Sequence, residues 1–482
     1  MGNYIGRERE TQELLRLYNS KRPEFVAVYG RRRVGKTFLI KEFFKDKMAF
    51  YHTGLSPFES LEGNQLTEQL RNFYASLRQY GCEEETRPTS WFEAFQLLKK
   101  ILEKRNKKER LVVFIDELPW MDTPRSNFLS AFEHFWNSWG ANQSNLLLVV
   151  CGSSTSWVRK NLIENRGGLY NRLTYEIKLY PFSLYESELY FKSLGVKLSR
   201  YDITQAYMAL GGIPYYMNFW NPSMSLAQNI DNLFFVKEAK LKTEFERLFG
   251  SLFTNAETYM AVVRFLSTKH CGFSRSEIAQ KTKIPDGGGL TSILEALEAS
   301  DFIVKYQPYE NNKRNLLYKV VDNFCLFYLR FVSSKKITDT QYWQKNLLSH
   351  DIATWRGIAF EEVCLQHIGQ IKKALGVSAV TSTEASWTLK GDESYSGAQI
   401  DLVITRSDNV VNLCEMKYYG DDYVVDKEED RKMRHRITMI NQTLSRKQTL
   451  FVVLITSFGL KQNAYSSIFQ QTITLDDLFE KP

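Results

Sequence analysis

The chain has 482 residues, of which 43% are apolar and 14% aromatic, and it carries a formal net charge of +8 with a pI near 8.9. This apolar content excludes a largely disordered protein, and the length predicts about three or four domains. No apolar run approaches the roughly 20 residues that a membrane-spanning helix needs, and the mild positive charge favours a polyanionic partner without requiring one.

The cysteines and the amino terminus indicate the compartment. The six cysteines are scattered, form no CxxC pair and in several cases lie inside apolar runs. This pattern predicts reduced, buried thiols and no zinc site. The amino terminus shows no signal-peptide pattern. Together these features predict a cytoplasmic protein that does not enter a membrane.

The first predicted elements are a helix and a strand. Residues 3–18 place Leu14, Leu15 and Leu17 after a charged turn, which predicts an amphipathic helix. Residues 25–29 form the apolar run FVAVY, which is typical of a buried strand in a parallel sheet. The next helix begins at Phe38, so a short loop separates the strand from that helix.

This loop, GRRRVGKT, matches the GxxxxGKT pattern of phosphate-binding loops. Gly30 and Gly35 allow the backbone N–H groups to face phosphate oxygens, and the following helix adds the positive end of its dipole. Lys36 is predicted to meet the β- and γ-phosphates, and Thr37 to offer its hydroxyl to Mg²⁺. The loop arginines are interpreted either as phosphate or domain contacts or as a solvated basic segment. The predicted nucleotide contacts are Gly30, Arg31, Arg32, Arg33, Val34, Gly35, Lys36, Thr37 and Phe38.

A second predicted strand, residues 112–115, ends in two carboxylates. Asp116 is predicted to hold the water shell of Mg²⁺, and Glu117 to orient or deprotonate the attacking water. The alternative is an ordinary strand that ends in an acidic turn. The preceding phosphate loop favours the functional interpretation.

Residues 5–15, IGRERETQELL, resemble the GRExE segment that precedes the phosphate loop in AAA-like ATPases of the STAND and origin-recognition kind. With the loop, this segment indicates an ATPase type described mainly from archaea. The resemblance implies that ATP is the nucleotide and that the segment lies beside the adenine. It also implies a sensor group for the γ-phosphate or the water at the end of strand 145–154, where Ser153 or Ser154 is the candidate and a plain turn is the alternative.

An arginine and a proline follow the predicted ATPase strands. Arg166 or Arg172 could reach a γ-phosphate within the chain or in a neighbouring subunit. The surrounding segment resembles the "lygR…PFS" segment of archaeal-type ATPases, which favours Arg172 over an ordinary surface arginine. GGIPYY, at Gly211–Tyr216, resembles the GxP step of the helical lid in STAND-type ATPases. This second resemblance implies that Pro214 lies near the adenine, with a simple helix boundary as the alternative.

Residues 256–332 predict three short helices and a hairpin, the order of a winged helix-turn-helix. Ser274 is expected to cap the second helix with Glu277 three residues later. Basic residues occupy the predicted wing, whereas the exposed face of the third helix carries two glutamates, so DNA contact and a packing role both stay open. The wing residues are Lys305, Lys313, Arg314 and Lys319, and the glutamates are Glu295 and Glu298.

The last predicted module has its own chemistry. A helix carries Glu361, a strand near residues 377–383 follows, and then strands 398–404 and 410–419 bear Asp401, Glu415 and Lys417. The two acids could hold Mg²⁺ while Lys417 steadies a phosphorane or a water nucleophile. The alternative is a pair of charged surface strands, although an unpaired acid in an apolar strand is costly.

This order of elements resembles the PD-(D/E)xK nuclease superfamily and the C-terminal domain of unknown function often joined to archaeal-type ATPases. The resemblance implies that Asp401 and Glu415 are metal acids, that Lys417 is the lysine and that Glu361 is the first-helix acid. Gln442 lies where some members place another polar residue. One departure is Ile400, which stands where the family has proline.

The sequence therefore predicts an α/β protein: a P-loop ATPase with a parallel sheet, a helical lid, a winged helix-turn-helix and a restriction-endonuclease-like C-terminal domain. The expected activity is Mg²⁺-dependent ATP hydrolysis that controls the last two modules, with DNA or another nucleic acid, an oligomer or a protein as partner. An ATP-dependent switch with an inactive C-terminal domain is the main alternative, and a small-molecule kinase leaves the C-terminal residues unexplained. The predicted boundaries are 1–182, 183–255, 256–332 and 350–482.

Overall fold

The computed structural model describes residues 4–56, 64–105, 108–165, 167–309, 316–333, 339–389 and 398–481. The chain forms two compact units. None of the helices in these ranges is long and apolar enough to cross a membrane. The first unit comprises Met1–Pro181, Glu246–Ala256 and Glu295–Asp301, and the second comprises Phe182–Phe245, Glu257–Leu294 and Phe302–Pro482.

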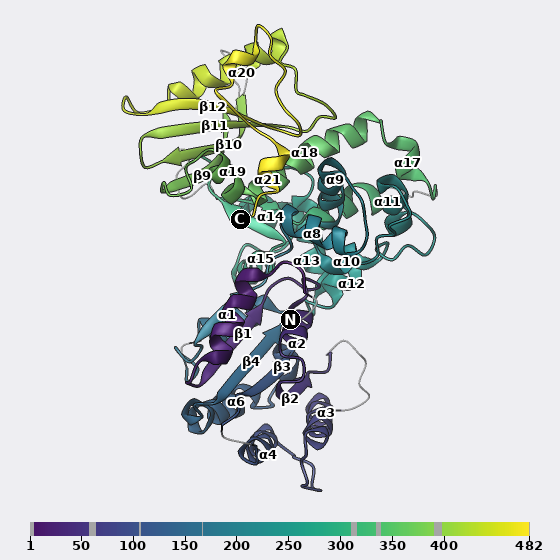
Figure 1. The fold of residues 1–482 in the computed structure, drawn as a ribbon, viewed down its shortest axis with the longest axis vertical. Helices are drawn as coiled ribbons and strands as arrows, with labels where there is room; N and C mark the ends of the chain where they lie inside the picture. Colours follow the sequence, from purple (N-terminus) through teal and green to yellow (C-terminus); the bar gives the residue numbers. More distant parts are fainter. Residues whose placement is uncertain are drawn as a thin grey trace. The chain divides into compact units, whose positions relative to one another are not determined.

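The first unit contains a five-stranded parallel sheet in the order β2-β3-β4-β1-β5 (Figure 1). Every residue of β1, β3 and β4 is buried, as expected for a parallel sheet covered on both faces. Because β4 lies between β1 and β3, the carboxyl ends of these three strands meet at one edge of the sheet. The strands are β1 (Glu24–Tyr29), β2 (Met48–Thr53), β3 (Leu111–Asp116), β4 (Leu146–Gly152) and β5 (Tyr175–Lys178).

Helices pack against this sheet through an aromatic core. Phe25 and Ala27 of β1 belong to a buried cluster that includes residues of α3, α4 and α6. Leu14 of α1 and Ile40 of α2 are buried outside that cluster. The helices are α1 (Glu8–Asn19), α2 (Lys36–Phe43), α3 (Gln65–Gln79), α4 (Trp91–Glu103), α5 (Leu118–Met121), α6 (Phe128–Ser138) and α7 (Thr155–Val158), with a 3₁₀ turn at Gly140–Asn142 and a π-turn at Arg159–Ile163.

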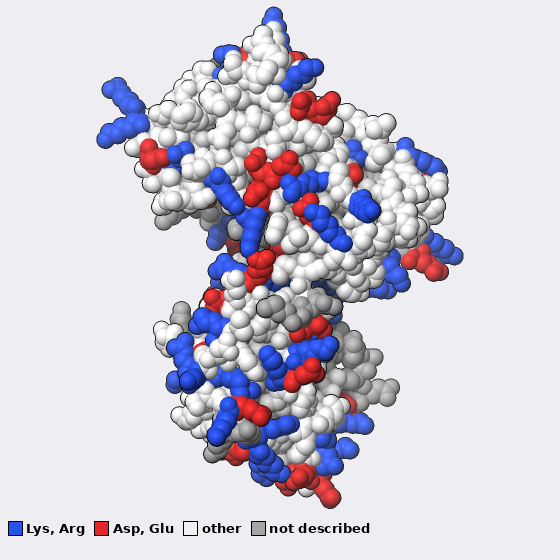
Figure 2. Space-filling model, viewed as in Figure 1, with Lys and Arg blue, Asp and Glu red and all other residues white. Residues whose placement is uncertain are grey.

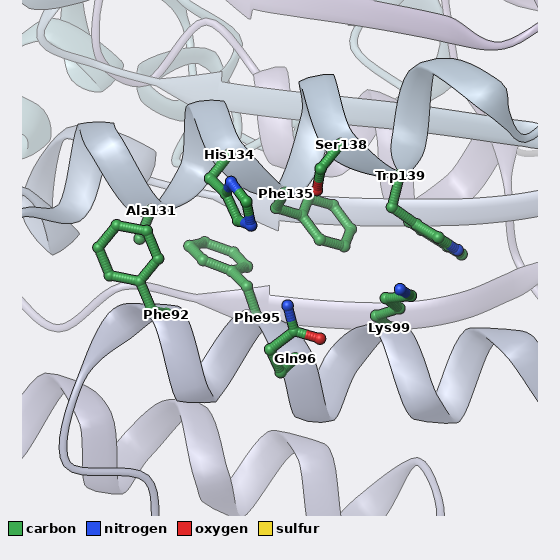
Figure 3. A pocket seen from close by; sticks show the side chains of 9 residues that line it. All are labelled: Phe92, Phe95, Gln96, Lys99, Ala131, His134, Phe135, Ser138 and Trp139. Carbon is green, nitrogen blue, oxygen red and sulfur yellow. The ribbon is translucent and has the colours of Figure 1, made fainter.

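A small hollow of about 230 Å³ lies between α4 and α6. Figure 3 shows Phe95 and Gln96 of α4 facing His134 and Phe135 of α6. None of the residues that line this hollow is a predicted nucleotide contact.

The second unit begins with helices, as predicted for residues 183–255. The turn before α10 contains Gly211 and Gly212, both with positive φ, 66° and 63°. A Cβ atom on Gly212 would lie 2.3 Å from the carbonyl oxygen of Phe182, so only glycine fits there. Pro214 then occupies the first position of α10, where its missing N–H costs nothing. The helices are α8 (Leu184–Ser193), α9 (Arg200–Leu210), α10 (Pro214–Met217) and α11 (Leu226–Phe234). The next helix, α12 (Glu244–Gly250), begins in this unit, but from Glu246 onward it belongs to the first unit.

Helices and a small antiparallel sheet, ordered β6-β8-β7, occupy the predicted winged-helix segment. Ser274 and Glu277 form the predicted capping box at the start of α14. The short strand β6 was not predicted, and the predicted turn at Glu310–Lys313 and residue Arg314 lie outside the described residues. The elements are α13 (Ala256–Leu266), β6 (Phe273–Ser274), α14 (Arg275–Thr282), α15 (Gly288–Ala299), β7 (Ile303–Tyr306) and β8 (Leu317–Val320), followed by α16 (Asn323–Phe327), a π-turn (Tyr328–Val332) and α17 (Tyr342–Asn346).

The C-terminal part contains a second five-stranded sheet, ordered β13-β12-β11-β10-β9 (Figure 1). Strands β9, β10 and β11 are antiparallel neighbours, whereas β12 runs parallel to β11 and β13. The elements are α18 (His350–Gln366), α19 (Ile368–Ala374), β9 (Ser382–Leu389), β10 (Ala398–Arg406), β11 (Val410–Lys417), α20 (Lys427–Asn441), β12 (Thr449–Thr456), a 3₁₀ turn (Ser466–Ile468), β13 (Gln471–Ile473) and α21 (Leu475–Leu478).

The strand expected near residues 377–383 was placed too early. Gly376 has a φ of 73° after α19, and the N–H of Val377 donates to Lys372 O at 2.8 Å. This helix-ending turn occupies the apolar residues that suggested a strand. Strand β9 therefore begins only at Ser382.

Candidate nucleotide site and C-terminal acidic site

The phosphate loop joins β1 to α2 with the backbone shape that its glycines predict. Gly30 has a φ of 136° and Gly35 a φ of 94°. A Cβ atom on Gly30 would lie 2.2 Å from Leu179 O, so the neighbouring chain leaves no room for a side chain. Arg33 also has a positive φ, 72°, which bends the loop between the two glycines.

Lys36 contacts the phosphate loop itself, and Thr37 connects the loop to Asp116 at the end of β3. Lys36 Nζ is buried and donates to Gly30 O at 2.9 Å and to Arg31 O at 3.0 Å. Thr37 Oγ1 lies 3.0 Å from each carboxylate oxygen of Asp116. Burial, with the charge of Glu117, raises the pKa of Asp116 to about 6. The sheet therefore brings together the hydroxyl and the carboxylate that the sequence assigned to one Mg²⁺ site.

Glu117 follows Asp116 at the same edge of the sheet. Its Oε2 accepts a hydrogen bond from Ser153 N at 3.0 Å and another from Ser153 Oγ at 2.9 Å. Glu117 also has a φ of 49°, a left-handed conformation that is uncommon outside glycine and is found at functional sites. The structure thus places Ser153, the first of the two candidate serines, directly against the predicted water-activating carboxylate.

The loop arginines are not a freely solvated segment. Arg31 is only 1% exposed, and Arg32 lies over the ring of Trp120 with 5.8 Å between its guanidinium carbon and the ring centroid. The interpretation of a solvated loop is therefore wrong for Arg31. Phe38, in contrast, is exposed on α2.

Sequence reasoning missed the role of Arg7 in the GRExE segment. Arg7 is buried and donates to Val34 O at 3.3 Å and to Tyr180 O at 2.7 Å. It therefore ties the start of α1 to the phosphate loop. A buried arginine among charged residues could have been suspected only from the motif, because nothing in the local hydrophobic pattern distinguishes it.

Arg172 lies near the amino ends of the sheet strands, whereas the phosphate loop lies at their carboxyl ends. It precedes β5, and Thr174 N donates to Phe25 O at 2.8 Å, near the start of β1. Gly30 is five residues further along, a distance of about 16 Å at the rise of a parallel strand. Arg172 is exposed. The geometry therefore disfavours a role within its own subunit and leaves the predicted role toward a neighbouring subunit.

Two other arginines, Arg166 and Arg159, follow β4 in the sequence. Arg166 lies outside the described residues. Arg159 follows β4 and α7 and lies near Tyr29, the last residue of β1. Burial and the charge of Glu176 raise the pKa of the Tyr29 phenol, and the positive charge of Arg159 opposes this rise. Arg159 therefore lies near the carboxyl end of β1, a position that no motif in the sequence indicates. It pairs with Glu164 at 2.6 Å.

The donors of the first unit fit Mg²⁺. This ion prefers oxygen ligands and usually takes one or two from the protein, with water and substrate phosphate completing its shell. Thr37 Oγ1 and the Asp116 carboxylate are adjacent oxygen donors and meet that requirement. Pro214 belongs to the second unit, so its predicted place near the adenine stays a prediction.

The predicted acids of the second unit meet on neighbouring strands. Leu402 pairs with Cys414 across the antiparallel β10–β11 ladder, and the same register places Asp401 opposite Glu415. Met416 N donates to Asp401 Oδ2 at 3.4 Å. A bulge in β10, between Ile400 and Val403, coincides with the acid. Bulges often redirect a side chain next to a functional site.

Glu415 is buried and held by two cations. Lys417 Nζ and Arg436 Nη1 each lie 2.8 Å from Glu415 Oε1. Arg436, on α20, was not predicted. Gln442, the predicted polar residue, instead caps the end of α20 and is exposed, whereas Arg436 of the same helix contacts Glu415.

Glu361, on α18, completes the acidic site. Burial and the charges of Asp401 and Glu415 raise the pKa of Glu361, and burial with the charge of Glu415 raises that of Asp401. These mutual effects require the three carboxyl groups to lie near one another. The structure thus brings together the residues assigned from the nuclease resemblance: Glu361, Asp401, Glu415 and Lys417.

The acids fit a divalent ion only in part. Within the described ranges, no three His, Cys, Asp or Glu side chains are arranged to hold one metal ion. Asp401 and Glu415 are still two adjacent carboxylates, which is enough for Mg²⁺ when water and substrate oxygens supply the other positions.

Lys319 differs from the prediction for the wing. Its ammonium lies 2.8 Å from Glu362 Oε2 of α18, and the side chain is 17% exposed. Lys319 therefore faces the C-terminal acids instead of an open wing surface. Lys305, another basic residue of the predicted wing, is exposed. Glu295 is exposed and Glu298 half-buried on α15.

One family model matches the amino-terminal part of the chain. Residues 4–218 match the family model described as an ATPase domain predominantly from Archaea. This match confirms the archaeal-type ATPase part of the predicted resemblance and supports ATP binding and hydrolysis.

Two relatives and one solved structure extend the comparison. An uncharacterised protein of Methanocaldococcus jannaschii is 23% identical over 433 residues, 86% of this chain and 87% of that protein. An uncharacterised ATP-binding protein of the same archaeon is 43% identical over 44 residues, 9% of this chain and 75% of its own. The Walker-type ATPase of Pyrococcus abyssi has a TM-score of 0.47 at 20% identity and covers 68% of this chain and 96% of its own.

Proposed function

We propose that the protein is a Mg²⁺-dependent ATPase whose nucleotide state controls a nuclease-like C-terminal site that acts on nucleic acid. The ATPase proposal rests on a series of contacting residues at the carboxyl ends of the sheet strands. This series runs from the phosphate loop to the sensor serine through Thr37, Asp116, Glu117 and Ser153.

Each residue has a defined part in hydrolysis. Lys36 neutralises charge on the β- and γ-phosphates, and Glu117 orients the attacking water and accepts its proton. Ser153 holds Glu117 in place through two hydrogen bonds to one carboxylate oxygen. Mg²⁺, held by Thr37 and by the water shell on Asp116, would supply positive charge at the phosphate oxygens.

The C-terminal site supports phosphodiester cleavage. Asp401 and Glu415 form the pair of oxygen donors, and Lys417 places an ammonium beside them. An ammonium in this position stabilises negative charge on a phosphorane or lowers the pKa of a water nucleophile. Lys and Arg side chains are interspersed with Asp and Glu on the face seen in Figure 2, so this face carries no single broad basic field.

The chain path supports control by the nucleotide. The chain passes between the two units five times, and α15 has its first residues in the second unit and its last in the first. Asp301, just after α15, pairs with Lys178 of β5 at 2.6 Å. A change in the ATPase sheet is therefore connected covalently to the segment predicted as a winged helix.

One observation favours the alternative of a switch with an inactive C-terminal domain. Lys417 and Arg436 both neutralise Glu415, so the acid already has two partners. A site of this kind can serve as a stable core for binding instead of as a catalyst. In this alternative, ATP governs partner assembly and Lys417→Ala leaves function intact.

The deciding experiment measures cleavage of single- and double-stranded DNA with Mg²⁺ or Mn²⁺, with and without ATP. We expect cleavage by the wild-type chain that disappears in both Asp401→Ala and Lys417→Ala. Lys372→Ala, a lysine paired with Glu384 outside the acidic site, serves as the control. A preparation that hydrolyses ATP and cleaves neither DNA would overturn the nuclease proposal and favour the switch.

A further inference from the structure

A cavity of about 590 Å³, partly open to solvent, adjoins the C-terminal acids. Its walls come from α18, β9, β10 and the predicted winged-helix segment. The polar residues that line it include Lys319, Glu361, Glu362, Ser386, Gln399 and Asp401.

The cavity reaches from the carboxylates to Lys319. Asp401 and Glu361 line one part of it, and Lys319, on β8, lines another. Lys319 is held by Glu362, the residue next to Glu361. Contacts between the hairpin segment and β9 fix this arrangement, since Tyr309 N donates to Ser386 O at 2.9 Å.

The ammonium of Lys319 retains hydrogen-bonding capacity. An ammonium group has three donors. In the described part of the chain, the hydrogen bond to Glu362 is the one formed by Lys319 Nζ. The other two donors can serve an anion without breaking the ion pair. Ser386 and Gln399 add hydroxyl and amide donors to the same cavity.

From this placement we infer that the cavity binds the phosphodiester segment next to the cleaved phosphate and that Lys319 is its phosphate-binding residue. This inference rests on the proposed nuclease function. In this inference, residues of the C-terminal sheet and of the predicted winged-helix segment together form the substrate site. The predicted winged-helix segment then contributes a cation to that site and does not form a separate DNA-reading surface.

The test uses the full chain and labelled single- and double-stranded DNA, with Ca²⁺ in place of Mg²⁺ to slow cleavage. Fluorescence anisotropy gives the affinity as a function of salt. Lys319→Met is expected to weaken binding about tenfold, the effect of one charge-assisted hydrogen bond. It should also lower the slope of log affinity against log salt by about 0.7 to 0.9, the value of one phosphate contact. Lys319→Arg should restore both.

Two further variants separate substrate binding from folding. Lys372→Met removes an equally half-buried lysine that pairs with a glutamate outside the cavity, and it should change neither quantity. Glu362→Gln keeps a hydrogen-bond acceptor but removes the charge that partly neutralises Lys319, so it should tighten binding. If Lys319 only supported the fold, Lys319→Met and Glu362→Gln would both weaken binding.

The outcomes distinguish this inference from the nuclease proposal. If the wild-type chain cleaves DNA and Lys319→Met behaves like Lys372→Met, the inference is overturned and the nuclease stands. If DNA binds in a Lys319-dependent way but no metal gives cleavage, the phosphate site stands and the nuclease fails. If the wild-type chain neither binds nor cleaves DNA, both are overturned.

Discussion

Ser153 donates both its backbone N–H and its hydroxyl to a single oxygen of Glu117. The other oxygen of that carboxylate is therefore the one available to a water molecule. This relationship fixes the predicted base at the end of β3 through a residue at the end of the neighbouring strand β4. It also gives the serine a role through the carboxylate in addition to any contact with the nucleotide.

Ser153→Ala should lower the turnover number for ATP about five- to tenfold, the effect of one hydrogen bond, with little change in KM. Glu117→Gln should lower turnover by at least about a hundredfold, because the base is lost. Steady-state phosphate release measures both. Ser154→Ala, the neighbouring serine, is the control and should keep wild-type turnover. An equal loss in both serine variants would contradict the assignment.

Lys36→Ala should abolish detectable ATP binding and turnover, because the variant loses the ammonium that meets the phosphates. Isothermal titration with ATP and Mg²⁺ measures the affinity. Lys41→Ala removes an exposed lysine from the same helix and should bind ATP normally. Unchanged affinity and turnover in Lys36→Ala would refute the nucleotide site.

Substitution of Arg172, near the amino ends of the strands, and of Arg159, near their carboxyl ends, should affect turnover differently as the protein concentration changes. Arg172→Ala should leave turnover unchanged in dilute protein and lose any gain that appears as the concentration rises, since this residue can act only on a neighbouring subunit. Arg159→Ala should lower turnover at every concentration, because its charge lies near the carboxyl end of β1 in the same subunit. Turnover of Arg172→Ala that matches the wild type at all concentrations would remove the arginine-finger role from Arg172.

Arg436→Gln should raise the affinity of the C-terminal site for Mn²⁺ by roughly five- to tenfold, because Arg436 and a metal ion compete for the Glu415 carboxylate. Titration followed by electron paramagnetic resonance measures the free ion. Arg434→Gln, which removes an exposed arginine from the same helix, is the control. A weaker affinity in Arg436→Gln would instead mean that Arg436 orients Glu415 for the metal.

His52 should make the stability of the first unit depend on pH. Burial lowers its pKa to about 3, whereas an unfolded histidine titrates near 6.5. Between these values the unfolded chain binds one more proton, so the free energy of unfolding falls as the pH decreases through this window. Urea unfolding at about pH 7 and about pH 5 should show a loss about 2 kcal/mol larger in the wild type than in His52→Asn.

The asparagine variant is suitable because it can keep the hydrogen bond between position 52 and Ser76 Oγ, which His52 Nδ1 makes at 2.9 Å. It removes only the titration. Equal pH dependence in the two proteins would show that another group controls acid unfolding.

Much of the nucleotide site could be predicted because its residues are local in sequence. Gly30, Gly35, Lys36 and Thr37 lie within one loop, and the apolar strand before Asp116 identified its partner. Ser153 needed the family resemblance, since a serine at a strand end has no pattern of its own. Arg7 and Arg159 depend on long-range contacts that no local spacing reveals.

The C-terminal acids could be predicted for a different reason. Strand alternation and one acid in an apolar run identified Asp401 and Glu415 on adjacent strands. The register that places them opposite each other, the bulge at Asp401 and the ion pair from Arg436 are tertiary facts. Lys319 was predicted as a basic wing residue, because its sequence neighbours gave no sign of Glu362 on α18.

The bulge in β10 also has an evolutionary consequence. Asp401 and Leu402 together stand opposite the single residue Ser386 of β9. Deletion of one residue at this point would convert the bulge into a regular ladder, so the sheet could persist while the acid left its position. A homologous protein could thus lose the acidic site through a single-residue deletion and keep the fold. In an alignment, a gap in this strand would mark the homologues that have lost the site.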